Sequence, residues 1–88
     1  MSVFTGGSAY NMVRDIADGF IPVNDRTFRK YGPREIADFC QEANRLLKEV
    51  RADQPALSQT EAIQKRQRRM QRLQQALTMA SAALQRKS

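Results

Sequence analysis

Apolar residues recur at intervals of three and four along most of the chain, and this period predicts α-helices. The first such stretch covers residues 9–18, and its shared apolar face consists of Ala9, Met12, Val13, Ile16 and Ala17. Ser8 precedes it as a candidate N-cap, and Gly19 follows it where a left-handed C-cap residue is favoured. The pattern therefore predicts a first helix over about residues 9–18.

A second amphipathic stretch begins at Pro33, since Gly32-Pro33 is a typical helix start, with proline at the first helical position. Its apolar face is formed by Ile36, Phe39, Ala43, Leu46 and Val50. The alternation of three- and four-residue steps continues to about Ala52, so a helix over residues 33–52 is predicted.

The segment 53–57 interrupts this periodicity, and a long final helix is predicted over residues 59–86. Ser58 and Glu61 have the spacing of a capping box, and Leu57 and Ala62 have that of a hydrophobic staple. No glycine or proline follows inside the helix, whose apolar seam is Ile63, Met70, Leu73, Leu77, Ala80 and Leu84. It is longer than its neighbour by about eight residues, on the order of 12 Å, so part of it should project or meet another chain.

The fold class predicted from these elements is all-α, a small helical bundle that forms one domain over residues 1–88. The short turn between the second and third helices favours an antiparallel helical hairpin, with the first helix packed across it. Residues 24–31 fit either a short helix capped by Asn24 or an irregular loop, and the short helix is the favoured reading.

The composition argues against catalysis and against a metal or organic cofactor. The chain has no histidine and a single cysteine, Cys40, so one copy cannot assemble the usual zinc or redox ligands. No serine or threonine has a histidine partner, and no phosphate-binding glycine loop is present. The lone cysteine is expected to be a buried, inert thiol. With neither a signal peptide nor an apolar span of membrane length, the protein is expected to be cytoplasmic.

The net charge of +6 resides almost entirely in the last third, because residues 58–88 carry seven basic side chains and one acidic one. Within the final helix a predicted basic stripe, more than 90° from the apolar seam, consists of Lys65, Arg68, Arg69 and Arg72. A row of such cations suits phosphate, which guanidinium groups bind through bidentate bonds with release of counterions. The competing interpretation is a solvated helix face.

Arg66 lies on the apolar seam itself, so it must extend to solvent, pair with an acid or mark a contact. Asp38, Glu42 and Glu49 on the preceding helix are its candidate acidic partners.

A second basic group is interleaved with aromatic residues and consists of Arg26, Phe28, Arg29, Lys30, Tyr31 and Arg34. Aromatic rings beside arginines can stack on exposed bases. More often such rings anchor a loop onto the core, which is the favoured interpretation here.

Two functions are compatible with this sequence. The first is a non-enzymatic, non-sequence-specific DNA- or RNA-binding or nucleoprotein-accessory module, with Lys65, Arg66, Arg68, Arg69 and Arg72 on the phosphates. The alternative is an oligomeric structural or adaptor protein that docks onto an acidic surface in a larger complex. Its contact seam would consist of Leu73, Leu77, Ala80 and Leu84.

Overall fold

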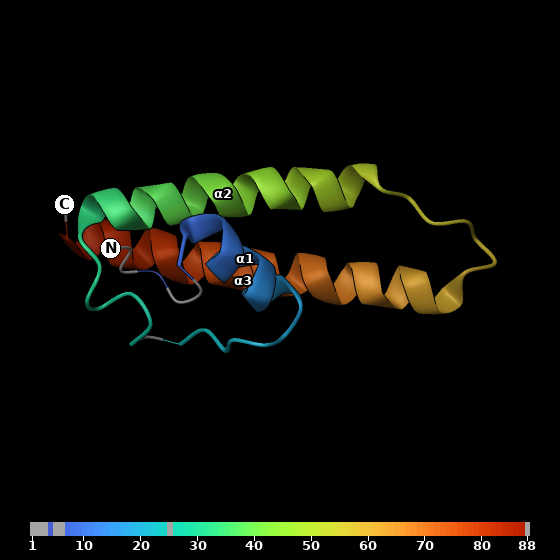
Figure 1. The fold of residues 1–88 in the computed structure, drawn as a ribbon, viewed down its shortest axis with the longest axis horizontal. Helices are drawn as coiled ribbons and strands as arrows, with labels where there is room; N and C mark the ends of the chain where they lie inside the picture. Colours follow the sequence, from blue (N-terminus) through green and yellow to red (C-terminus); the bar gives the residue numbers. More distant parts are fainter. Residues whose placement is uncertain (1–3, 5–6, 25, 88) are drawn as a thin grey trace.

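The fold is an all-α bundle of three helices in the part of the chain that the computed structural model describes, which is residue 4, residues 7–24 and residues 26–87. The helices are α1 (Ala9–Ala17), α2 (Pro33–Ala52) and α3 (Thr60–Lys87). Helices α2 and α3 form an antiparallel hairpin, and the shorter α1 packs against both (Figure 1). The predicted fold class is confirmed, and the predicted helix bounds agree within one residue.

Local sequence signals determine both ends of α1. Ser8 is the N-cap, and its Oγ accepts a hydrogen bond from the backbone N–H of Asn11 at 3.1 Å. Gly19 has a φ of 84°, a left-handed conformation that glycine adopts without strain. The N–H of Phe20 then donates to the carbonyl of Asp15 at 2.8 Å, which closes the helix with a Schellman-type turn. Both predicted caps of α1 are confirmed.

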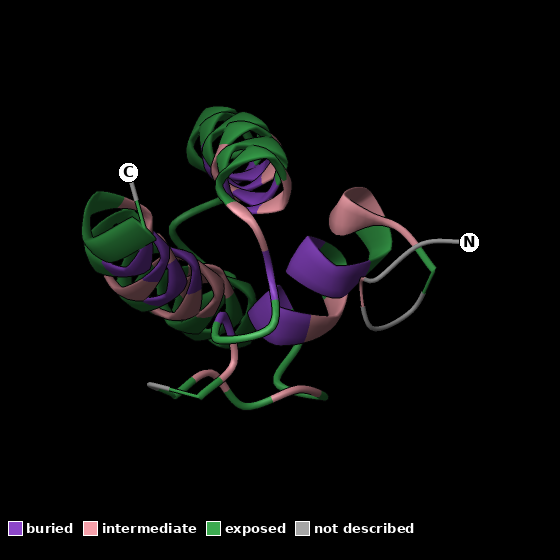
Figure 2. Cartoon of the chain, turned by 90° about the vertical axis from the view of Figure 1, so that its left-hand side faces the viewer, coloured by how far each residue is buried: buried purple, intermediate pink, exposed green. Residues whose placement is uncertain are grey.

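The core lies between the three helices, on the faces drawn in purple in Figure 2. Helix α2 supplies more of its large side chains than either other helix, including Ile36 and Phe39, while α1 contributes Met12 and Ile16. On α3 the buried residues are Leu73, Ala76, Ala80 and Ala83. Because three of these four are alanines, α3 presents a smooth surface to its neighbours, and the bulk of the core comes from the other elements.

The buried face of α3 differs from the predicted seam. Leu73 and Ala80 are fully buried in the chain's own core, whereas Leu77 and Leu84 are half-buried at its edge. At 100° per residue the buried face is centred about 70° away from the predicted seam, on the side of the basic stripe. The seam predicted to meet a partner therefore packs mainly within this chain.

Residues 26–30 form hydrogen-bonded turns and not the favoured short helix, although residue 25 lies outside the described residues. The turns are held by bonds of the i to i+3 type, such as Thr27 N–H to the Asn24 carbonyl at 3.1 Å. Asn24 acts as a local cap, since its Oδ1 accepts from the N–H of Arg26 at 2.8 Å. The next turns bury the Phe28 and Tyr31 rings, and the N–H of Tyr31 donates to the carbonyl of Phe28 at 3.2 Å.

The tip of the hairpin departs from the predicted capping motif. Helix α3 begins at Thr60, and it is Gln59 whose side chain accepts a hydrogen bond from the N–H of Ala56 at 3.1 Å. Leu57 is 94% exposed, so the predicted staple with Ala62 is wrong. The first turn of α3 extends beyond the end of α2, and the connecting loop runs outward around it (Figure 1).

Candidate functional site

Two members of the predicted basic stripe point toward α1. The Nε of Arg69 lies 3.4 Å from the Asp18 Oδ1, and the Nη1 of Arg72 donates to the Ala17 carbonyl at 3.0 Å. Arg69 and Arg72 are half-buried, whereas Lys65 and Arg68 are exposed. The structure therefore divides the stripe into an exposed pair and a pair that holds the C-terminal end of α1.

Arg66 makes the equivalent contact at the end of α2. Its Nε donates to the Val50 carbonyl at 3.0 Å, and its Nη2 donates to the Arg51 carbonyl at 2.9 Å. Two of the candidate acidic partners for Arg66 have a different partner, since Glu42 and Glu49 each form an ion pair with Arg45. Arg66 binds carbonyls in place of carboxylates because the last carbonyls of a helix lack intrahelical donors and carry the partial negative charge of the helix dipole.

The hydrogen bond of Arg72 predicts that this side chain contributes more to the free energy of unfolding than Arg68, an exposed arginine of the same helix. Arg72→Met should lower the free energy of unfolding by about 1–2 kcal/mol, because it removes a partly buried hydrogen bond from a charged donor. Arg68→Met, at an exposed position of the same helix with similar helix propensity, should change it by less than about 0.5 kcal/mol. Urea denaturation followed by circular dichroism measures both. Equal effects would show that Arg72 contributes no more than an exposed arginine.

A larger cluster of cations lies at the opposite end of the bundle, where α2 begins and α3 ends (Figure 1). The Nζ of Lys87 donates to the carbonyls of Phe28, Arg29 and Tyr31, the first at 2.8 Å and the second at 2.7 Å. These bonds fasten the loop of residues 26–32 to the last turn of α3. The result is what we call the basic end, formed by Arg26, Arg29, Lys30, Arg34, Arg86 and Lys87.

A hollow of about 380 Å³ lies on the basic end, and its lining includes Arg29, Arg86 and Lys87. The cations of the predicted secondary patch, Arg26, Arg29, Lys30 and Arg34, are all exposed. Arg86 and Lys87 join them without having been part of that prediction. Lys87 and Arg29 are 58 positions apart in the sequence, so no local sequence pattern predicts their contact. The two adjacent cations in the last turn of α3 are only a weak sequence signal for a basic site.

The aromatic members of that patch serve the core. Phe28 and Tyr31 are each 1% exposed, and the Phe28 ring packs edge-on against Phe39 with centroids 4.9 Å apart. Because neither ring is accessible, neither can stack on a nucleic-acid base in this conformation. The favoured interpretation of these aromatics as loop anchors is in agreement with the structure.

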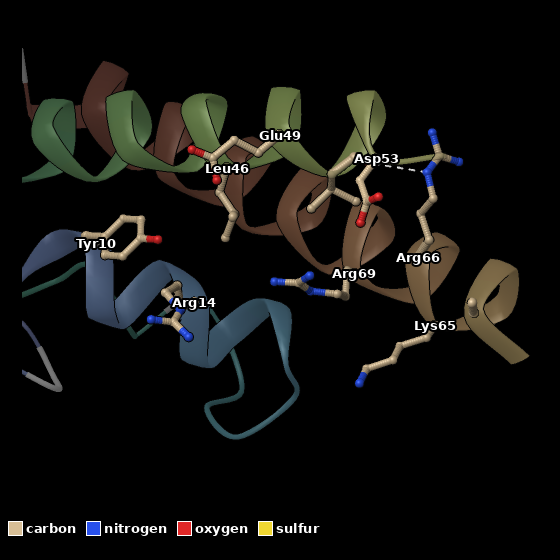
Figure 3. A pocket seen from close by; sticks show the side chains of 10 residues that line it. Tyr10, Arg14, Leu46, Glu49, Asp53, Lys65, Arg66 and Arg69 are labelled. Atoms are coloured by element: carbon tan, nitrogen blue, oxygen red, sulfur yellow. Dashed lines mark hydrogen bonds between the residues drawn. The ribbon is translucent and has the colours of Figure 1, made fainter. Parts of the chain in front are cut away.

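A mixed-charge groove of about 590 Å³ lies between the three helices on the side toward the hairpin tip, and its lining extends from Tyr10 of α1 to Ala62 of α3 (Figure 3). Its lower wall in Figure 3 carries Arg14 of α1 with Lys65 and Arg69 of α3, and its α2 wall carries Glu49 and Asp53. Apolar side chains from Leu46, Val50 and Ala62 line it as well. The cations and the carboxylates therefore belong to separate sides of one groove.

Cys40 is half-buried, and burial raises the pKa of its thiol, an effect partly offset by a hydrogen bond with Ser81. A raised pKa reduces the thiolate fraction at neutral pH, which lowers reactivity. Within the described ranges, histidine, cysteine and carboxylate side chains form no group of three that could hold a metal ion. Of the three helices described, none is both long and apolar enough to cross a bilayer.

Comparison of the chain with protein-family models, with curated proteins and with solved structures finds no match. The interpretation of its function therefore depends on the geometry and charge of the two ends of the bundle.

Proposed function

We propose that this protein is a non-enzymatic nucleic-acid-binding module that contacts the phosphate backbone through the basic end. The observation that supports this proposal most strongly is the convergence of two segments distant in sequence. Residues 26–35 and 83–87 together place six cationic side chains on one end of the molecule, and Glu35 is the single acidic residue described in them. Such an unbalanced concentration of charge is the usual footprint of phosphate binding.

The basic end suits phosphate better than the α3 stripe does. Arg69 and Arg72 are occupied by Asp18 and by a carbonyl of α1, so they would have to release these partners to reach a phosphate. Arg29 and Arg86, by contrast, are exposed beside the same hollow. Guanidinium groups free of internal partners can bind phosphate oxygens in a bidentate manner.

The expected recognition does not depend on base sequence. Sequence is read by side chains that reach base edges, through a helix or ribbon inserted in a groove. The basic end consists instead of a turn-rich loop, the first turn of α2 and the last turn of α3, and its aromatic rings are buried. Backbone contacts of this kind give affinity and little discrimination between bases.

Binding to nucleic acid measured as a function of salt tests the proposal. Fluorescence anisotropy of labelled DNA and RNA oligonucleotides of unrelated sequence should show similar affinities that fall steeply with salt. Four or five phosphate contacts predict a slope of log affinity against log salt near roughly −4. If neither polymer is bound at low salt, the proposal is refuted.

A further inference from the structure

The mixed-charge groove between α1, α2 and α3 has a property that the basic end lacks, which is the presence of carboxylates on the wall that faces its cations. Of its cations, Arg69 is paired with Asp18, and Arg66 is held by the terminal carbonyls of α2. Glu49 is paired with Arg45, so the groove charges that form no ion pair or carbonyl contact among the described residues are Arg14 and Lys65 on one side and Asp53 on the other. Asp53 offsets part of the attraction that these cations would exert on a free anion.

The arrangement is instead complementary to itself. In a two-fold dimer the same patch of both copies forms the interface. The acidic α2 wall of one copy can then face the basic α3 wall of the other, so that both walls find opposite charges at once. If both walls of the groove carried charges of one sign, two identical copies would repel each other. The attraction between copies therefore depends on Asp53 and Lys65 lying on opposite walls.

An uncovered apolar side chain lies next to this groove. Leu57, at the tip between α2 and α3, is 94% exposed and is the most exposed large hydrophobic residue described. The groove starts at the base of the same tip, since Asp53 and Ala62 both line it. Two copies that meet tip to groove would cover each Leu57 against the apolar lining from Leu46, Val50 and Ala62 of the other copy.

We propose that the hairpin tip and the mixed-charge groove form a homodimer interface, in which each copy places Leu57 in the groove of the other. Asp53 of each copy then pairs with Lys65 of the other. The small core adds a reason, since three of the four buried residues of α3 are alanines and domains with small cores gain stability from association. The proposal does not depend on nucleic-acid binding, because the groove and the basic end lie at opposite ends of the bundle.

Sedimentation equilibrium without nucleic acid tests this directly. The mass of the wild-type protein should rise with concentration from 10.0 kDa toward twice that value. Leu57→Ser should weaken self-association by at least about tenfold, because it removes the apolar contact at the centre of the interface. A wild-type protein that stays monomeric up to about millimolar concentration would overturn the proposal, since standard interfaces associate more tightly.

A charge-exchange experiment tests the pairing itself. Asp53→Lys and Lys65→Asp each place like charges opposite each other, so each variant alone should be monomeric. An equimolar mixture should form a mixed dimer, because the cation introduced in one chain then faces the carboxylate introduced in the other. Both substitutions suit the helix dipoles, with a cation at the end of α2 and an anion near the start of α3, so folding should be retained. If the mixture stays monomeric while the wild type dimerises, these residues do not pair.

Discussion

Replacing Arg29, Lys30, Arg34 and Arg86 together with glutamine is expected to abolish measurable binding to DNA and RNA at moderate salt. Each phosphate contact contributes about 0.9 to the log–log salt slope, so four lost contacts should reduce its magnitude by about 3.6. At about 0.1 M salt the counterion-release contribution makes this roughly a thousandfold loss of affinity. Fluorescence anisotropy at several salt concentrations measures both quantities.

The appropriate control removes the same charge from the other end of the molecule. Lys48, Arg51, Lys65 and Arg68 are exposed, and replacing all four with glutamine lowers the net charge by the same amount. This variant should keep most of the affinity and most of the salt slope, and both variants should match the wild type in helix content. If the control variant loses as much binding as the other, the affinity comes from net charge and not from the basic end.

The set of control residues also separates the two candidate nucleic-acid surfaces. Lys65 and Arg68 are the exposed members of the basic stripe of α3. If nucleic acid binds through the stripe, binding should be lost in the control variant and kept in the variant that lacks the charges of the basic end. Arg69 and Arg72 are left unchanged in both variants, because their contacts with α1 would mix a loss of stability with a loss of binding.

Phe39→Ala is expected to bring the protein close to unfolding at room temperature. The Phe39 side chain is fully buried, and its ring packs edge-on against Phe28. Truncating a buried phenylalanine costs about 3–5 kcal/mol. A domain of this size has a total stability of about 4–13 kcal/mol. Chemical denaturation followed by circular dichroism measures the change.

Leu57→Ala is the matched control for this prediction, since it also removes a large apolar side chain. Leu57 is almost fully exposed, so the free energy of unfolding of the monomer should change by less than about 0.5 kcal/mol. The measurement belongs at low protein concentration, where the monomer predominates. A Phe39→Ala protein as stable as this control would mean that the core can rearrange to fill the space.

The helices could be predicted from sequence because their ends carry local signals. Ser8, Gly19 and Pro33 act within a few residues of the boundary that they determine, and each predicted boundary is found within one residue. The buried face of α3 was harder to predict, because its centre consists of Ala76, Ala80 and Ala83. Alanine is common on both buried and exposed helix faces, whereas the leucines that suggested a seam lie partly at the edge of the core.

The partners of the arginines could not be predicted for a different reason. Arg66 and Arg72 bind carbonyl oxygens, which every residue possesses, so the sequence contains no complementary residue to search for. Only the relative placement of the helices brings a helix end within reach. The same holds for Lys87, whose bonds to the loop unite two basic segments that the sequence displays as separate.

The contact between Arg72 and the end of α1 has a consequence for the order of folding. Helix α1 has nine residues, fewer than the roughly 12–15 at which isolated helices become even marginally stable in water. Its C-terminal carbonyl is held by a side chain 55 positions later in the chain. During synthesis α1 can pack against α2 first, and the contact from Arg72 is added once the middle of α3 is available. A contact of this kind that forms after the folding transition state mainly slows unfolding and leaves the folding rate nearly unchanged.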